Sequence, residues 1–293
     1  MEKFLIDVSE HNGTINWDQV KGHIDGAIIR CGYGMDMTSQ DDKQWSRNVA
    51  ECDRLGIPYG VYIYSYATNT GKARSEAQHV LRLIKGHKLS YPVYYDLEDK
   101  SIEGAAVANA NIFGDIIEAA GYWCGVYYNR DWHNRIIKGQ LDRFTRWGAG
   151  YGTNNGQKQD NYKPGFGEDI WQYSSVGSVP GVSGNVDVNV CYRDFPAEIG
   201  GNTNHQASAP APAPQKTESK INTIIRDGQI HSQNFAGTGI NADGIYGPET
   251  KKAGIKVLQQ AMNLDYKAGL AVDGIWGTKS EAALGSHTVR KGE

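Results

Sequence analysis

The stretch Tyr91-Pro92-Val93-Tyr94-Tyr95-Asp96-Leu97-Glu98-Asp99 joins residues of high strand propensity to three acids within four positions. Because alternate side chains of a strand share one face, we expect Asp96 and Glu98 to point the same way, about 6.6 Å apart along the strand. Two carboxyl groups this close titrate as a coupled pair, which suits acid-assisted cleavage of an acetal. Alternatively, these acids only cap the following helix or are solvated.

Composition limits the classes to which the chain can belong. Its 293 residues have room for one large domain and a small one. The net charge of −3, without a basic block, argues against nucleic acid as a partner. No apolar run approaches the ~18 residues of a membrane span, so we expect no membrane partner. The start, Met1 to Asp7, is too short an apolar run for a signal peptide, which predicts synthesis in a cytosol without an export signal.

Short β-rich runs recur along the first 195 residues, and the early ones are separated by segments of helical spacing such as Asp42–Leu55. Strand-helix alternation indicates right-handed crossovers and a parallel sheet, and eight strands favour closure into a barrel. We therefore predict the α/β class, as a modified TIM-like (β/α)5(β)3 barrel with a small, mainly helical C-terminal domain. The eight expected strands are Phe4–Ser9, Gly26–Gly34, Tyr59–Tyr66, Tyr91–Glu98, Tyr122–Asn129, Arg143–Tyr151, Ile170–Ser175 and Val186–Tyr192.

Acidic residues gather where such a barrel places its chemistry, at the carboxyl ends of the strands. Asp7 ends the first expected strand, and Asp96 and Glu98 end the fourth. Asp187 begins the eighth, and it reaches the same mouth if that strand is antiparallel to the others. Aromatic side chains near other strand ends are candidate sugar contacts, although core packing is the alternative for each. They are Tyr62, Tyr64, Tyr127, Trp147, Trp171 and Tyr173.

The sequence lacks the motifs that would indicate a metal site, a nucleotide cofactor or a serine hydrolase. The eight histidines are scattered without a His-Glu-x-x-His motif. The cysteines Cys31, Cys52, Cys124 and Cys191 are widely spaced, which favours reduced core thiols. No Gly-x-Gly-x-x-Gly follows the first strand and no Gly-x-Ser-x-Gly elbow occurs. We expect neither a metal site nor a cofactor.

The composition changes after the eighth strand. Residues 197–220 include Ser208-Ala209-Pro210-Ala211-Pro212-Ala213-Pro214, and alternating Ala-Pro is typical of a semi-rigid linker. The tail, 221–293, contains an internal repeat: Asp243-Gly244-Ile245-Tyr246-Gly247 is echoed by Asp273-Gly274-Ile275-Trp276-Gly277. We predict domains at 1–196 and 221–293 joined by the linker 197–220.

Several ordered motifs together resemble glycoside hydrolase family 25, the lysozymes (N-acetylmuramidases) of phage endolysins and bacterial autolysins. The resemblance covers about residues 3 to 195 and implies a flattened barrel of five strand-helix units and three further strands. The family cleaves the β-1,4 bond from N-acetylmuramic acid to N-acetylglucosamine in peptidoglycan. The motifs are Asp7-Val8-Ser9-Glu10-His11-Asn12-Gly13, Asp96-Leu97-Glu98, Trp147-Gly148-Ala149-Gly150-Tyr151-Gly152, Trp171-Gln172-Tyr173-Ser174 and Val186-Asp187.

Carried over by motif, the resemblance implies that Glu98 is the general acid and Asp96 its partner, with Asp7 and Asp187 completing the acidic site. Either of the latter two could instead cap a turn. Retention of configuration is expected, with the muramic 2-acetamido group or Asp96 as the nucleophile. Many members read Gly-x-Tyr-His-Phe on the third strand, whereas this chain has Ile63 in place of the histidine.

The tail resembles helical peptidoglycan-binding domains that carry Asp-Gly-Ile-x-Gly units. His287 to Glu293 is compatible with the opening of a further unit, which would make the chain truncated. The expected partner is bacterial peptidoglycan of a Gram-positive wall, reached when a phage-type endolysin is released at host lysis.

Two other functions stay open at the sequence level. Chitinase-like barrels use a strand reading Asp-x-Asp-x-Asp-x-Glu, but the two earlier positions here are Pro92 and Tyr94. In a non-catalytic wall-binding protein, the acids would only bind sugar.

Overall fold

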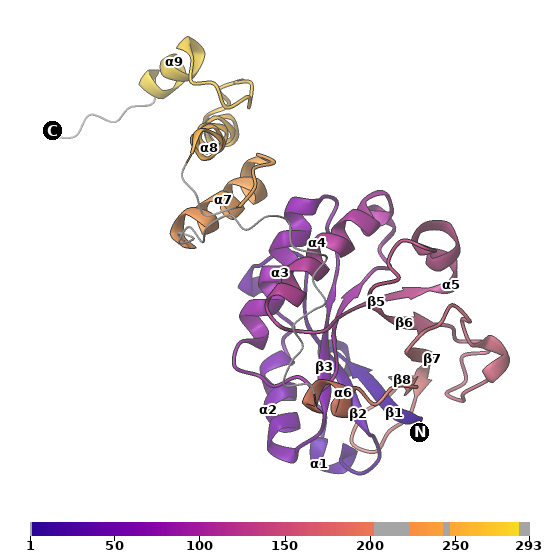
Figure 1. Ribbon diagram of the computed structural model, residues 1–293. Helices are drawn as coiled ribbons and strands as arrows, with labels where there is room; N and C mark the ends of the chain where they lie inside the picture. The colour runs from indigo at the N-terminus through magenta and orange to yellow at the C-terminus, as the bar shows by residue number, and fades with distance from the viewer. Residues whose placement is uncertain (1, 202–222, 243–246, 287–293) are drawn as a thin grey trace. The chain divides into compact units, whose positions relative to one another are not determined.

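The computed structural model describes residues 2–201, 223–242 and 247–286, drawn as coloured ribbon in Figure 1. The chain divides into two compact units, one ending at Pro210 and the other beginning at Ala211. The helix α6 (Phe195–Gly201) spans the domain end expected at residue 196. Residues 202–220 of the expected linker, and the expected further unit at 287–293, lie outside the described residues. The domain boundaries therefore stay predictions.

Eight strands close into a barrel in the order in which they occur along the chain. The pairings from β1 to β7 are all parallel, whereas β8 runs antiparallel to both β7 and β1. The predicted fold class is confirmed. The sequence left the direction of the last strand open, and the antiparallel direction observed is the one that brings Asp187 to the same mouth. The strands are β1 (Lys3–Val8), β2 (Gly26–Tyr33), β3 (Tyr59–Tyr64), β4 (Val93–Asp96), β5 (Cys124–Asn129), β6 (Thr145–Ala149), β7 (Ile170–Gly177) and β8 (Val186–Cys191).

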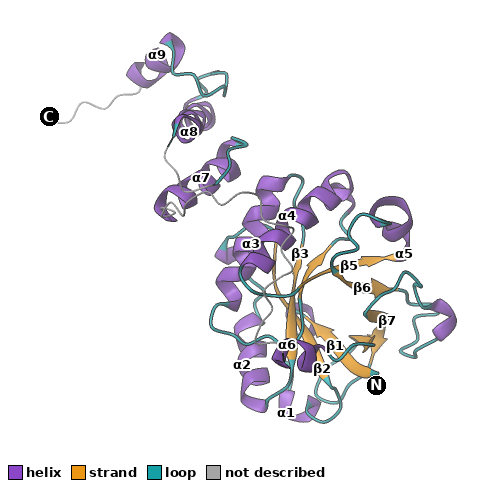
Figure 2. Cartoon of the chain, viewed as in Figure 1, coloured by secondary structure: helices purple, strands orange, loops and turns teal. Residues whose placement is uncertain are grey.

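Helices follow the early strands and become short toward the end of the barrel. Asn69 begins α3 by accepting the Lys72 amide hydrogen, and Gly56 ends α2 in the left-handed conformation, at φ 66°. Figure 2 shows that mostly loops surround β6 and β7. The helices are α1 (Trp17–Val20), α2 (Trp45–Leu55), α3 (Thr70–Ile84), α4 (Ala106–Ala119) and α5 (Arg130–Trp132), the 3-10 turns η1 (Glu10–Asn12), η2 (Thr38–Gln40), η3 (Lys100–Ala105) and η5 (Asp160–Tyr162), and the π-helical turn η4 (His133–Ile137).

Strand alternation divides the core into two layers. Tyr94 points into the barrel, and its ring fills the space so closely that a Cβ on Gly125 would lie 2.3 Å away. Tyr95 points outward and stacks on Phe113 of α4, with ring centroids 4.1 Å apart. The four cysteines are buried free thiols, as predicted. The same alternation brings Asp96, two positions after Tyr94, to the inner mouth of the barrel.

The second unit contains α7 (Thr223–Ala236), α8 (Pro248–Tyr266) and α9 (Thr278–Ser286). Two glutamines make equivalent contacts, because Gln229 and Gln259 each donate to a hydroxyl 21 residues further along the chain, on Thr250 and Ser280 respectively. This agreement extends the repeat seen in the sequence, although Asp243 to Tyr246 lie outside the described residues. In the described part of the chain, no helix combines the length and the apolar character that a membrane crossing requires.

Candidate active site

A pocket of about 310 Å³ opens at the carboxyl ends of the parallel strands. It contains all four carboxylates singled out in the sequence, which arrive from β1, the end of β4, the loop after β4, and β8. Their convergence follows from barrel closure, which brings the first and last strands side by side. The lining residues are Asp7, Ser9, His11, Asn12, Arg30, Tyr62, Tyr64, Asp96, Glu98, Tyr127, Trp147, Tyr151, Gln172 and Asp187.

Asp7 and Asp187 form a directly opposed pair across the antiparallel contact of β1 and β8. Burial raises the pKa of Asp7 well above its usual value, and the neighbouring Asp187 charge raises it further. Burial also raises the pKa of Asp187 to about 6, opposed by its hydrogen bond with Asp7. The two carboxyl groups therefore titrate as a coupled pair in which ionisation of both is disfavoured.

Two amides orient the Asp7 carboxylate. Its Oδ2 accepts hydrogen bonds from Gln172 Nε2 at 2.9 Å and from Asn189 Nδ2 at 2.8 Å. The Gln172 Oε1 atom accepts from the hydroxyls of Tyr127 and Tyr151 at 2.7 and 2.6 Å. These buried bonds fix the direction in which the Gln172 amide faces, and with it the position of Asp7.

A second relay reaches Asp7 from β6. Trp147 Nε1 donates to Asn189 Oδ1 at 2.8 Å, and the other end of the Asn189 side chain donates to Asp7. One tryptophan therefore supports an acid on the opposite side of the pocket through a single amide.

Asp96 is the most isolated acid of the site. It ends β4, is 4% exposed, and its Oδ1 atom is buried without a hydrogen-bond partner among the described residues. Burial raises the pKa of Asp96 well above its usual value, the charges of Glu98 and Asp7 raise it further, and Arg30 opposes them. An oxygen that is buried and unbonded is available to a bound ligand.

Glu98 differs from Asp96 in its exposure. The β4 ladder closes with the Leu97 amide donating to the Tyr127 carbonyl, so Glu98 lies in the loop beyond the strand and is exposed to solvent. The expected strand Tyr91–Glu98 thus begins two residues too early and ends two residues too late. Both acids nevertheless line one pocket. Partial desolvation raises the pKa of Glu98, and the charges of Asp187 and Asp99 add to the increase.

Four of the six expected aromatic contacts lie in the pocket: Tyr62, Tyr64, Tyr127 and Trp147. Trp147 meets the rings of Tyr62 and Tyr127 edge to face, with centroids 5.7 and 4.6 Å apart. Ile63, at the position where many family members have histidine, is buried on the outer side of β3 and does not line the pocket.

Trp171 and Tyr173 lie elsewhere. Strand alternation sends Gln172 of β7 inward, so its two neighbours point outward and pack in the outer core. Trp171 is fully buried and donates its indole hydrogen to the Gly150 carbonyl. The motif Trp171-Gln172-Tyr173 therefore supplies its glutamine to the pocket.

Sequence reasoning missed Arg30, Tyr151, Gln172 and Asn189. Strand parity relative to Asp7 and Asp187 would have selected Asn189 as an inward residue of β8, because it lies two positions after Asp187. Arg30 carried no such signal. Its Nε and Nη2 atoms bind Asp42 and Glu10 at 2.8 and 3.0 Å, which ties β2 to the segments that follow β1 and β2.

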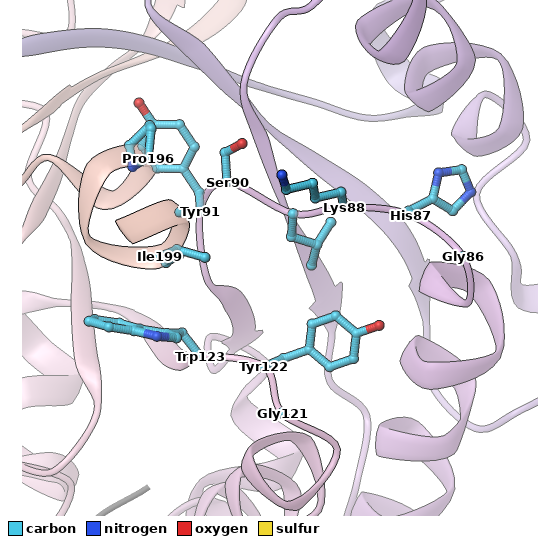
Figure 3. A pocket seen from close by; sticks show the side chains of 12 residues that line it. Gly86, His87, Lys88, Ser90, Tyr91, Gly121, Tyr122, Trp123, Pro196 and Ile199 are labelled. Carbon is cyan, nitrogen blue, oxygen red and sulfur yellow. The ribbon is translucent and has the colours of Figure 1, made fainter. Parts of the chain in front are cut away.

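Larger hollows lie at the opposite end of the barrel. The one in Figure 3 is formed by the segments that precede β4 and β5, together with α6, and includes Lys88, Tyr122, Trp123 and Ile199. None of its twelve lining residues is acidic, so it lacks the groups for acid-base hydrolysis. Within the described residues, no three His, Cys, Asp or Glu side chains are arranged to hold a metal ion.

Comparison with known proteins decides the family. The model of the family described as Glycosyl hydrolases family 25 matches residues 6–182. The chain belongs to this family. The resemblance drawn from the ordered motifs is thereby confirmed, and the chain is a glycoside hydrolase. The matched residues contain Asp7, Asp96 and Glu98, whereas Asp187 lies just beyond them.

Relatives within family 25 share both sequence and fold. The autolytic lysozyme of Clostridium acetobutylicum is 28% identical over 282 residues, covering 95% of this chain and 77% of that protein. The modular autolysin LytC from Streptococcus pneumoniae, solved with a synthetic peptidoglycan ligand, is 36% identical with a TM-score of 0.55. That match covers 65% of this chain and 47% of LytC, so the chain spans about half the length of LytC.

A phage protein is also similar. The catalytic domain of an endolysin from a Listeria monocytogenes bacteriophage is 25% identical, with a TM-score of 0.60. The match covers 69% of this chain and 98% of that domain. The eight-stranded barrel is therefore an architecture shared with autolysins and endolysins.

Proposed function

We propose that this chain is a lysozyme that hydrolyses the β-1,4 bond between N-acetylmuramic acid and N-acetylglucosamine in bacterial peptidoglycan. The observation that carries the proposal is the pairing of a buried acid, Asp96, with an exposed acid, Glu98, in one pocket walled by aromatic rings. Similarity to an autolytic lysozyme, and to an autolysin solved with a synthetic peptidoglycan ligand, supports peptidoglycan as the substrate.

Glu98 is the proposed general acid. Its raised pKa keeps a proton on the carboxyl group at a pH where an ordinary glutamate is ionised. Its exposed position at the pocket rim suits delivery of that proton to the leaving oxygen of a bound glycan.

Asp96 is the proposed anionic partner. Burial and the Asp7 charge raise the pKa of Asp96, but protonation of Glu98 removes one further opposing charge, and Arg30 favours the ionised form. An ionised Asp96 would stabilise positive charge at the anomeric carbon, orient the muramic 2-acetamido group, or itself attack. Attack by the acetamido oxygen or by Asp96 inverts the anomeric carbon once and attack by water inverts it again, so either of these routes gives retention of configuration, which we propose for this enzyme.

Asp7 and Asp187 complete the site as a proton-sharing pair. They stand across the pocket from the β4 acids and raise the pKa values of Asp96 and Glu98 respectively through their charge. We assign them to holding the charge and geometry of the site rather than to bond cleavage.

Mass spectrometry of digested wall tests the proposal. A muramidase leaves reducing N-acetylmuramic acid ends, a chitinase-type glycosidase leaves reducing N-acetylglucosamine ends, and a binding protein releases neither. Anomeric NMR of the first product formed distinguishes retention from inversion. Absence of new reducing muramic ends would refute the assignment.

The domain organisation and the type of cell wall on which the enzyme acts are also proposals. We propose a catalytic barrel at 1–196, a linker at 197–220 and a wall-binding unit at 221–293, acting on a Gram-positive wall after release at lysis. The equivalent Gln229 and Gln259 contacts support a repeated structure in the last unit. Retention of a 221–293 fragment by purified wall tests its binding, and no retention would count against it.

A further inference from the structure

Three tyrosines form a cluster beside the acidic pocket, at the carboxyl ends of β2 and β3. Tyr64 lines the pocket, and the Tyr66 ring lies beside it with centroids 5.0 Å apart. Tyr33, the register partner of Tyr64, meets Tyr66 edge to face at 6.3 Å. Tyr66 is 46% exposed, which is unusual for a tyrosine within the well-packed barrel unit. The cluster therefore continues the aromatic wall of the pocket outward.

The short loop that carries Tyr66 is fixed by a buried carboxylate. Glu76 of α3 is fully buried, and its Oε1 accepts the Tyr66 amide hydrogen at 2.8 Å. Its Oε2 accepts from the hydroxyls of Ser65 and Tyr95. Burial raises the pKa of Glu76 to about 7, although these three hydrogen bonds lower it. Burying a carboxylate is costly, so its position calls for a reason.

Further bonds hold both ends of the same loop. The Ser65 amide donates to the Asp96 carbonyl at 3.2 Å, and buried Asn109 of α4 donates to the Ala67 carbonyl at 2.6 Å. Loops with exposed side chains are ordinarily mobile. Here the backbone on either side of one exposed ring is anchored to α3, to α4 and to the strand that carries Asp96.

The shared property of these contacts is that they fix the backbone that carries Tyr66 relative to the acids. A rigid aromatic face loses little conformational freedom when a ligand covers it, and it offers an apolar surface to the C–H face of a sugar ring. A glycan is a continuous chain, so sugars on either side of the cleaved bond must leave the pocket along its rim. Tyr66 lies on that rim, next to the pocket-lining Tyr64.

We propose that Tyr66, backed by Tyr33 and Tyr64, is a substrate-binding residue that stacks on a sugar of the glycan strand outside the acidic pocket, and that Glu76 is a positioning residue that holds it there. The inference rests on the proposed hydrolysis of peptidoglycan glycan. It assigns the enzyme a preference for strands long enough to reach the tyrosine cluster.

The test compares substrate lengths. Kinetics of the full chain and of Tyr66→Ala and Tyr66→Phe are measured on purified glycan strands of two lengths, a tetrasaccharide and a strand of at least ten sugars. We expect Tyr66→Ala to raise KM for the long strand by about 3- to 10-fold with kcat nearly unchanged, and to leave the short substrate unaffected. Tyr66→Phe keeps the ring and should behave as wild type. Tyr122→Ala, which removes a partly buried ring at the other end of the barrel, is the control for loss of an aromatic side chain away from the pocket.

Glu76→Gln tests the positioning role. It should raise KM selectively for the long strand, and combining it with Tyr66→Ala should add nothing, because both act through one ring. A merely structural role would instead lower activity on both lengths and add to the Tyr66 effect. If Glu76→Gln does not fold, the Tyr66 variants still decide the proposal.

Equal KM values for wild type and Tyr66→Ala on long strands would overturn the inference. Equal losses on both lengths would overturn it as well. Failure of the wild-type protein to release muramic reducing ends would refute the proposed function, which is a separate result.

Discussion

Asp7 on β1 and Asp187 on β8 face each other at the seam where the first and last strands close the barrel. Their separation along the chain is nearly the whole length of the barrel domain, yet they share a hydrogen bond. Closure of the barrel therefore brings two carboxyl groups into contact. Because such a pair cannot both ionise without cost, this contact adds to burial in raising the pKa of Asp7.

This pair predicts how stability depends on pH. The pKa of Asp187 in the folded protein is raised to about 6, so the folded state binds its proton more tightly than the unfolded state does. The resulting stabilisation is present at low pH and is lost as the pH rises from about 4 through about 6. We expect the thermal midpoint to rise when the pH falls from about 7.5 to about 5.5, and to rise less in Asp187→Asn. Differential scanning calorimetry measures both, and equal slopes would contradict the assignment.

Glu98→Gln should abolish hydrolysis while leaving the fold intact. The side chain is exposed, so its loss of charge disturbs little packing, whereas loss of a general acid costs about 10²- to 10⁴-fold in rate. Release of reducing ends gives the rate, and thermal unfolding gives the stability. Glu118→Gln makes the same chemical change on α4, at the other end of the barrel, and should keep full activity. Appreciable lysis by Glu98→Gln would remove Glu98 from its role.

Two tryptophan substitutions separate the site from the outer core. Trp147→Phe loses the bond to Asn189 and leaves a buried acceptor unsatisfied, so we expect a loss of about 1–3 kcal/mol in stability together with a lower kcat. Trp171→Phe loses the bond to the Gly150 carbonyl, with a similar loss of stability but unchanged kcat per folded molecule. Chemical denaturation and steady-state kinetics are the measurements. If kcat falls in Trp171→Phe but not in Trp147→Phe, the assignment of Trp147 to the site and of Trp171 to the outer core is wrong.

Gln259 is expected to hold the repeat loop of the second unit. Its side chain is 2% exposed, donates to Asp273 and to the Ile275 carbonyl, and accepts the Gly274 amide hydrogen. Gln259→Leu should destabilise this unit by about 1–3 kcal/mol and weaken retention on purified wall, while hydrolysis of soluble glycan stays unchanged. Gln260→Leu, at a partly exposed neighbouring position, is the control. If Gln259→Leu is retained on purified wall as well as the wild type, the loop that Gln259 holds does not contribute to wall binding.

The sequence alone predicted the barrel and picked out the four acids that line the pocket. Eight β-rich runs with helices between the early ones leave few topologies, and a carboxyl-end position for Asp7 and Asp96 follows from strand direction. Those features depend on local propensity and alternation, which a sequence records directly.

Only the tertiary structure decided which neighbours complete the pocket. Trp171 and Gln172 are adjacent in sequence, but their side chains lie on opposite faces of β7. Trp171 packs in the outer core, whereas Gln172 donates a hydrogen bond to Asp7. The register of β7 with β6 and β8 decides which residue faces inward. Likewise, the Glu76 carboxylate meets the Tyr66 backbone amide because α3 folds back against the segment that follows β3. Contacts between distant segments depend on how the whole chain packs, and no local pattern encodes that.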